Sequence, residues 1–277
     1  MVERALVLGG GGHTGGAWEI GVLAGLADAG VDLTDADLLV GTSAGAVMGA
    51  WIASGTPVEE IHERQSAPYG DGPTVEVPFT VVARFLWAML AFRTPKATAR
   101  HLGRMALAAR TVPEEEALRT MGAMLPVRDW PDRPLRVAAA DAHTGEVTAF
   151  HSGSGVDLLR AVTASGTLPG VWPPLEIGGR RWIDGGVRST TNADLARGCR
   201  RIVILAPVAK GPGVAAARHA AELRADGSKV ALLTPDAAAR RAFGRDALDP
   251  ARRGPAARAG RAQAAGYAEA VAEVWRG

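Results

Sequence analysis

A strand–turn–helix pattern around Ser43 constrains the fold more than any other feature of the sequence. Leu38–Val40 is a short apolar run typical of a buried strand, and the pentapeptide Gly41–Gly45 (GTSAG) follows it directly. The small residues of Ala46–Ala53 then predict a helix. In a G-x-S-x-G turn of this kind, the backbone bends sharply and projects the serine hydroxyl from the end of a sheet. Ser43 is therefore a candidate nucleophile, and Gly41 and Gly45 leave room for the turn.

Apolar runs alternate with helical patterns along most of the chain. This alternation predicts an α/β fold, with a mostly parallel central sheet that helices cover on both faces. The strands expected besides Leu38–Val40 are Ala5–Leu8, Leu135–Ala140, Val147–Phe150, Arg180–Ile183, Arg201–Ala206 and Val230–Leu233. The clearest helices expected are Ala17–Ala29, Val156–Thr163 and a long C-terminal helix over Ala256–Trp275.

The length of 277 residues fits a single catalytic domain over residues 1–277. Residues from about 57 to 125 show helical patterns and no clear strand, which predicts a helical insertion. Residues from about 236 to 277 predict a helical C-terminal extension after a linker rich in Pro, Arg and Gly.

The composition excludes several classes of protein. The chain has 31 Lys and Arg against 29 Asp and Glu, spread along the sequence, so no basic patch for nucleic acid is expected. A single cysteine, Cys199, allows no internal disulfide and no cysteine-based metal site. The N-terminus lacks the pattern of a signal peptide, and no apolar stretch is long enough to span a bilayer. We expect a cytoplasmic protein.

A run of glycines follows the first predicted strand. Gly10, Gly11 and Gly12 stand where unobstructed backbone N–H groups can donate to an oxyanion. The same residues, with Gly15, also spell the G-x-G-x-x-G fingerprint of dinucleotide-binding folds, with Asp32 or Asp35 as a ribose-binding acid. The serine turn, which comes only one predicted helix later, favours the oxyanion interpretation, and a dinucleotide-binding module stays an alternative.

A third motif, Asp184-Gly185-Gly186, ends the predicted strand Arg180–Ile183. An aspartate held on such a turn can present its carboxylate to another side chain. Taken alone, Asp-Gly-Gly is most often a turn signal. Its importance therefore depends on the other two motifs.

The order of the three motifs resembles that of the patatin-like phospholipases. The resemblance covers most of residues 5–210 and includes Ser165–Pro169 (SGTLP), which is similar to a Ser-x-x-x-Pro stretch of that family. It implies a three-layer fold in which Ser43 attacks an ester carbonyl and Asp184 takes its proton. It also implies acyl lipids as substrates, an acyl-enzyme that water releases, and neither a metal nor an organic cofactor.

The sequence departs from the family pattern in the glycine loop. Thr14, preceded by His13, stands where the family usually has Arg or Lys, and the loop is one residue longer. A catalytically silent patatin-fold protein that binds a lipid or a partner is therefore one alternative. A conventional Ser-Asp-His esterase is another, and His219 is its only candidate histidine after Asp184. His219 falls within a helical pattern, so we expect it on a helix surface and outside the site.

The segment Phe79–Phe92 is apolar nearly all round and is broken only by Arg84. A fully buried helix explains this pattern, and so does a lid or an interfacial helix that contacts a membrane. The sequence favours the buried helix and keeps peripheral membrane contact as the alternative.

Overall fold

The computed structural model describes residues 2–68, 79–92, 94–209, 211 and 213–276. Over these residues, an eight-stranded sheet runs in the order β5-β6-β3-β2-β1-β7-β8, with β4 paired to β3 beside this path. The strands β3, β2, β1, β7 and β8 are parallel, whereas β4, β5 and β6 join the sheet in antiparallel pairs. The predicted mostly parallel sheet is confirmed. The strands are β1 (Arg4–Leu8), β2 (Leu38–Thr42), β3 (Leu135–Asp141), β4 (Val147–Phe150), β5 (Leu175–Ile177), β6 (Arg180–Asp184), β7 (Arg201–Leu205) and β8 (Lys229–Leu233).

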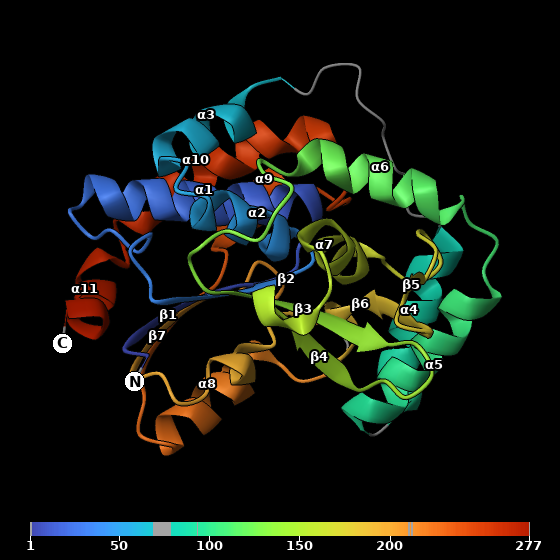
Figure 1. The fold of residues 1–277 in the computed structure, drawn as a ribbon. Coiled ribbons are helices and arrows are strands. Elements are labelled where there is room, and N and C mark those ends of the chain that lie inside the picture. Colours follow the sequence, from blue (N-terminus) through green and yellow to red (C-terminus); the bar gives the residue numbers. More distant parts are fainter. Residues whose placement is uncertain (1, 69–78, 93, 210, 212, 277) are drawn as a thin grey trace.

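Helices cover the sheet on both faces and give a three-layer α/β fold (Figure 1). The upper layer in this view holds α1 (Gly12–Asp28), α2 (Ala44–Ala53), α3 (Val58–Ser66), α6 (Glu114–Met124), α7 (Leu158–Gly166), α9 (Ala237–Phe243) and α10 (Arg253–Ala264). The lower face carries α8 (Ala216–Ala225), and α4 (Phe79–Ala91) and α5 (Pro95–Ala108) lie at the end of the sheet near β4–β6. The last helix, α11 (Ala268–Arg276), packs beside β7 and β8.

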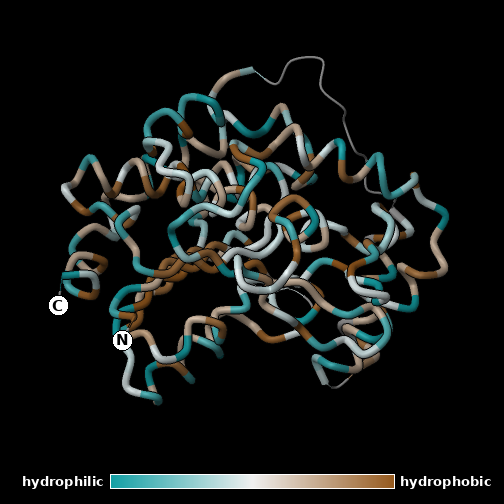
Figure 2. Tube along the Cα trace, viewed as in Figure 1, coloured by the Kyte–Doolittle hydropathy of each residue, from teal (hydrophilic) through white to brown (hydrophobic). Residues whose placement is uncertain are grey.

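The central strands are apolar on both faces because both faces are covered. In β1, Leu6 and Leu8 belong to the core under α1 and α2, whereas Ala5 and Val7 belong to a second core under α8. Successive side chains of a strand point to opposite faces, so a run without polar residues is what a doubly covered strand needs. Figure 2 shows these strands as the most hydrophobic part of the trace.

The first helix begins earlier than predicted. The sequence predicts a loop over the glycine-rich residues 12–16, because glycine has a low helix propensity. In the structure α1 already begins at Gly12, and Thr14, Gly15 and Gly16 are buried. Tertiary packing overrides the local preference here.

The prediction of a fully buried helix over Phe79–Phe92 is wrong. Val81 and Ala88 are buried, but Trp87 is 54% and Leu90 is 88% exposed. The helix lies at the edge of the molecule, where it packs on α5 and leaves Trp87 and Leu90 exposed to solvent. An apolar pattern all round a helix therefore does not mean a buried helix in this protein.

The prediction of a single long C-terminal helix over Ala256–Trp275 is also wrong. Residues predicted as one helix form α10 and α11, separated by a turn at Gly266. The turn lets α10 lie along α1 while α11 packs beside β7 and β8. Within the described residues, no helix is long and apolar enough to cross a membrane.

The contact between α1 and α10 gives a prediction about stability. A Cβ atom at Gly21 would lie 2.0 Å from the carbonyl oxygen of Ala257, so the two helices can approach this closely only without a side chain there. We expect Gly21→Ala to lower the free energy of unfolding by roughly 1–3 kcal/mol, as overpacking does. Chemical denaturation measures this change. The control is Gly266→Ala, because a Cβ there meets its nearest atom at 3.5 Å. Equal stability of the two variants would contradict the prediction.

Candidate active site

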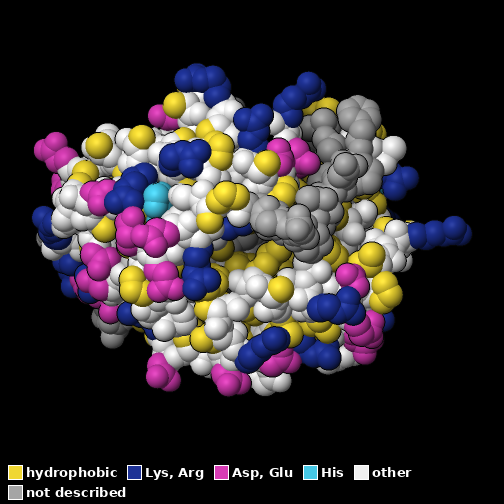
Figure 3. Space-filling view, turned by 90° about the horizontal axis from the view of Figure 1, so that it is seen from above, with side chains coloured by type: hydrophobic (Ala, Val, Ile, Leu, Met, Phe, Trp, Pro, Cys, Tyr) yellow, Lys and Arg dark blue, Asp and Glu magenta, His cyan; other side chains and the backbone are white. Residues whose placement is uncertain are grey.

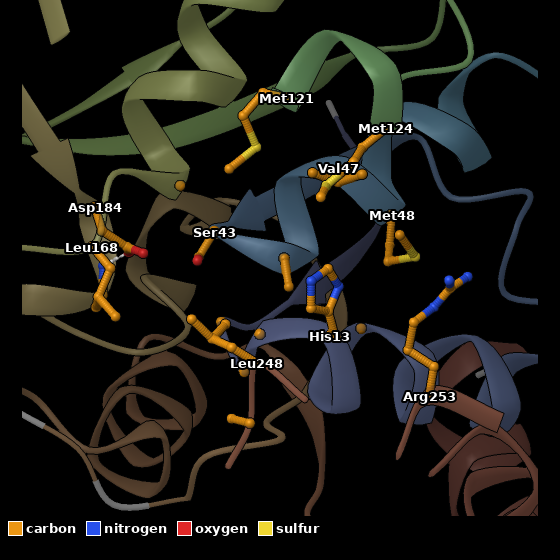
Figure 4. A pocket seen from close by; sticks show the side chains of 18 of the residues that line it. His13, Ser43, Val47, Met48, Met121, Met124, Leu168, Asp184, Leu248 and Arg253 are labelled. Atoms are coloured by element: carbon orange, nitrogen blue, oxygen red, sulfur yellow. Dashed lines mark hydrogen bonds between the residues drawn. The ribbon is translucent and has the colours of Figure 1, made fainter. Parts of the chain in front are cut away.

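Ser43 occupies a strained turn between β2 and α2. Its backbone has φ 55° and ψ −121°, a conformation that side-chain-bearing residues rarely adopt. The turn is possible because Gly45 lies directly against β1, where a Cβ would be 2.2 Å from the carbonyl oxygen of Leu8. The conformation of this turn points the serine side chain away from the sheet and into a cavity (Figure 4).

Asp184 ends β6 and faces Ser43 across this cavity (Figure 4). Its Oδ1 accepts a hydrogen bond of 2.7 Å from the backbone N–H of Gly186, which fixes the side chain. The carboxylate points toward the Ser43 hydroxyl (Figure 4). The structure thus brings together the two residues that the sequence motifs singled out, although 141 positions separate them in the chain.

Burial changes the acidity of Asp184. The side chain is almost inaccessible to water, and this desolvation raises its pKa to about 6, against the opposing effects of the nearby Ser43 side chain and of the hydrogen bond from Gly186. A carboxylate with this pKa is still ionised at neutral pH. It is a stronger base than a solvent-exposed aspartate, whose pKa is near 4.

A buried asparagine links the turns that carry Ser43 and Asp184. The Asn192 side chain donates to Thr42 Oγ1 at 3.1 Å and to the carbonyl oxygen of Gly185 at 3.1 Å. Thr42 precedes Ser43, and Gly185 follows Asp184. Arg188 in turn donates to Asn192 Oδ1 from two guanidinium nitrogens. Nothing in the sequence analysis pointed to Asn192, because its effect depends on contacts between distant segments.

Ser165 is a second residue whose contribution the sequence analysis missed. Its hydroxyl oxygen accepts a hydrogen bond of 2.8 Å from the backbone N–H of Ser43. The predicted helix over Val156–Thr163 stopped short of this residue, whereas α7 extends to Gly166 and ends in the Ser165–Pro169 stretch that resembles the family. That resemblance was the available signal.

The glycine loop lies beside Ser43. A Cβ on Gly10 would be 3.2 Å from Ser43 Cβ, and Gly10, Gly11 and Gly12 all line the cavity. The N–H of Gly10, however, donates to the carbonyl oxygen of Thr190 at 2.7 Å. This bond occupies the Gly10 N–H, so Gly11 and Gly12 are the two of the three predicted donors that remain for an oxyanion.

Glu19 lies buried below the glycine loop. Its Oε1 accepts a hydrogen bond of 2.6 Å from the N–H of Gly9, and the side chain is fully inaccessible to water. Burial raises the pKa of this carboxyl well above its usual range, which favours its neutral form. A glutamate inside an apolar helix has no sequence signal that distinguishes a buried from an exposed position.

The cavity that Ser43 and Asp184 share has a volume of about 890 Å³. Its walls are mainly apolar, with Val47 and Met48 of α2, Met121 and Met124 of α6, and Leu168 and Leu248 (Figure 4). Figure 3, seen from above, shows hydrophobic side chains at a hollow in the middle of this face. A cavity of this size and lining suits a ligand with a long apolar part.

The cavity has a basic end. In the view of Figure 4, Arg253 lies at the end away from Ser43, and His13 lies between them. Arg64 and Arg245 line the cavity together with Asp246. Arg253 donates to Gln65 Oε1 at 3.0 Å and to the carbonyl oxygen of Arg64 at 2.8 Å. Burial and the charge of Arg253 lower the pKa of His13, so its imidazole is neutral at pH 7.

His219 lies outside this cavity. The structure corrects its expected place on a helix surface, because its side chain is buried in α8 against Ser189 and Asp194. Burial lowers the pKa of His219. Its ring contacts neither Ser43 nor Asp184, so the arrangement is not that of a Ser-Asp-His triad. No cluster of three or more potential metal ligands occurs among the described side chains.

The comparison with protein families decides which kind of protein carries this site. Residues 6–197 match the model of the family described as patatin-like phospholipase. The chain belongs to the patatin-like phospholipase family. All three motifs lie inside the matched region, whereas Leu248 and Arg253 lie beyond it. No curated protein sequence matches the chain.

Two solved structures are similar to this patatin-like chain. VipD from Legionella pneumophila shares 13% sequence identity with a TM-score of 0.48, over 98% of this chain and 67% of VipD. The type III effector protein ExoU shares 16% identity with a TM-score of 0.42, over 97% of this chain and 53% of ExoU. The patatin-like chain thus corresponds to only part of either protein.

The hydrogen bond from Ser43 to Ser165 gives a prediction. Ser165→Ala leaves the partly buried N–H of the strained turn without its acceptor, which costs roughly 1–3 kcal/mol in the free energy of unfolding. We also expect kcat to fall roughly tenfold to a hundredfold for an ester substrate, because the nucleophile is less well positioned. Denaturation and steady-state kinetics measure the two effects.

The matched control is Thr163→Val in the same helix. The buried Thr163 hydroxyl finds no hydrogen-bond partner within the described part of the chain, so its removal should change neither quantity strongly. A Ser165→Ala variant that behaves like Thr163→Val would contradict the positioning role.

Proposed function

We propose that this protein is a serine acyl hydrolase that cleaves lipid esters with a Ser43–Asp184 dyad. The observation that carries the proposal is the geometry of the site: Ser43, held in a strained turn, points toward the buried carboxylate of Asp184 at a large apolar cavity. Membership of the patatin-like phospholipase family supports a lipid substrate.

The proposed reaction has two steps. Ser43 Oγ attacks the ester carbonyl carbon while its proton passes to Asp184, and the tetrahedral intermediate collapses when the alcohol leaves with that proton. The acyl group is now esterified to Ser43. Water then attacks the acyl carbon and gives a proton to Asp184. Ser43 recovers a proton when the carboxylic acid leaves.

The oxyanion of each intermediate needs hydrogen-bond donors that are already in place. Gly11 and Gly12 are the donors that we propose, since both line the cavity at the N-terminus of α1 and the helix dipole favours negative charge there. This role does not require a cation at Thr14. Family membership favours it over the dinucleotide-binding interpretation of the same glycines.

We further propose that residues 1–277 act as one catalytic unit. The walls of the cavity come from the predicted helical insertion (57–125), through Phe85, Met121 and Met124, and from the predicted C-terminal extension (236–277), through Leu248 and Arg253. Both additions therefore shape the acyl-binding space. Contact with lipid at a membrane surface and a cytoplasmic location are part of the same proposal.

The experiment that tests the function compares wild type, Ser43→Ala and Asp184→Asn on p-nitrophenyl esters of increasing chain length. We expect wild type to prefer the longer acyl chains. Each variant should lose at least about a thousandfold in kcat/KM, because it lacks the nucleophile or its base. Labelling by a fluorophosphonate probe should require Ser43.

Two further outcomes separate the alternatives. Loss of turnover in a folded His219→Gln variant would favour a conventional triad over the dyad. A folded wild-type protein with neither turnover nor labelling would contradict the proposed function and indicate a catalytically silent patatin-fold protein.

A further inference from the structure

Most of the exposed large hydrophobic side chains belong to one part of the molecule. Within the described residues, those classed as exposed are Val2, Trp87, Leu90, Leu107 and Val112. All except Val2 lie on α4, on α5 or just after α5. Exposed hydrophobic side chains that gather in this way mark interaction surfaces.

The helix α4 has two distinct apolar sides. The buried or half-buried positions Val81, Phe85, Ala88 and Phe92 recur every three or four residues and form its inner side. Phe85 lines the cavity that contains Ser43. The exposed positions, which include Arg84, Trp87 and Leu90, recur at the same spacing and form the outer side.

Aromatic contacts join the outer side of α4 to α5. The ring centroid of Trp87 lies 5.7 Å from that of Phe92 and 5.0 Å from that of His101, which belongs to α5. Phe92 also contacts His101, at 4.9 Å. The two helices thus present one joined surface, which we call the α4–α5 surface and define by Arg84, Trp87, Leu90, Arg100, Arg104 and Leu107.

All Lys, Arg, Asp and Glu side chains in the segment that contains α4 and α5 are basic. Between Glu76 and Glu114 the sequence contains six Lys and Arg residues and neither Asp nor Glu, although the whole chain is almost balanced at 31 against 29. Arg84, Arg100 and Arg104 are exposed. Lys96 pairs with Glu146 of another segment, at 2.7 Å, so we leave it out of the surface.

We propose that the α4–α5 surface docks on an anionic lipid bilayer. Trp87 and Leu90 would enter the boundary between headgroups and acyl chains, where tryptophan is favoured, and the arginines would contact lipid phosphates. The absence of acidic side chains from this stretch of sequence complements a negatively charged surface. Docking itself does not depend on the proposed function. Only its link to catalysis does: Phe85, on the inner side of α4, lines the proposed catalytic cavity and so places the docked surface next to it.

The experiment measures binding of full-length Ser43→Ala protein to vesicles, so that no lipid is consumed. We expect sedimentation with vesicles of equal parts phosphatidylcholine and phosphatidylglycerol, and at least tenfold weaker binding to phosphatidylcholine alone. Trp87→Ser/Leu90→Ser and Arg84→Glu/Arg104→Glu, made in the same background, should each weaken binding to the anionic vesicles at least tenfold. High salt should weaken the binding as well.

The matched control is Arg200→Glu/Arg218→Glu. It makes the same change in net charge at two side chains that are 69% and 71% exposed and lie away from α4 and α5. The control should bind the anionic vesicles as the parent does. If it lost binding equally, net charge rather than this surface would explain docking, and the proposal would fail.

Two other measurements keep docking separate from catalysis and from self-association. In the background with Ser43 intact, Trp87→Ser/Leu90→Ser should hydrolyse a short soluble ester at the wild-type rate, which shows that the site is folded. If the protein binds vesicles but has no esterase activity, the result would support docking by the α4–α5 surface and contradict the proposed function. A dimer in solution that Trp87→Ser/Leu90→Ser converts to a monomer, without any vesicle binding, would overturn the proposal in favour of a second copy as the occupant.

Discussion

The strained backbone of Ser43 is the constraint on which the rest of the site depends. A residue held at φ 55° costs on the order of 1–3 kcal/mol, and the surrounding structure must offset this cost. Gly45 allows the turn to pack closely on β1, the Ser165 hydroxyl accepts a hydrogen bond from the N–H of Ser43, and Asn192 donates a hydrogen bond to the preceding Thr42. These contacts come from segments far apart in the chain. The nucleophile is therefore positioned by the whole fold and not by its pentapeptide alone.

The electrostatics of the site follow from burial. Asp184 would be a weak base in water. Its burial beside an apolar cavity raises its pKa to about 6, closer to the neutral pH at which a general base is most effective. Glu19, under the glycine loop, is fully buried, which raises its pKa and favours the neutral form, and its Oε1 accepts a hydrogen bond from the N–H of Gly9. Burial thus raises the pKa of both carboxyl groups. A single ionised carboxylate beside Ser43 is what a dyad requires.

The sequence predicted the parts of the structure that depend on local pattern. The apolar strands, the turn at Ser43 and the turn at Asp184 all lie where the motifs placed them. Predictions failed where packing between distant segments decides the outcome. The start of α1 at Gly12, the burial of His219 and the exposure of Leu90 each depend on what lies against the helix, and a helical pattern does not contain that information. Asn192 and Arg253 became visible as part of the site only in three dimensions, whereas the family resemblance of its stretch was a sequence signal for Ser165.

The central claim is that buried Asp184 activates Ser43, and the most direct test is the pH dependence of fluorophosphonate labelling of Ser43. Asp184 must be ionised to accept the proton, so the labelling rate of wild type should rise with pH through an apparent pKa of about 6 and then level off. Asp184→Asn should label far more slowly and without this step. A wild-type profile that is flat through this range, or an Asp184→Asn variant that labels as fast as wild type, would contradict the account.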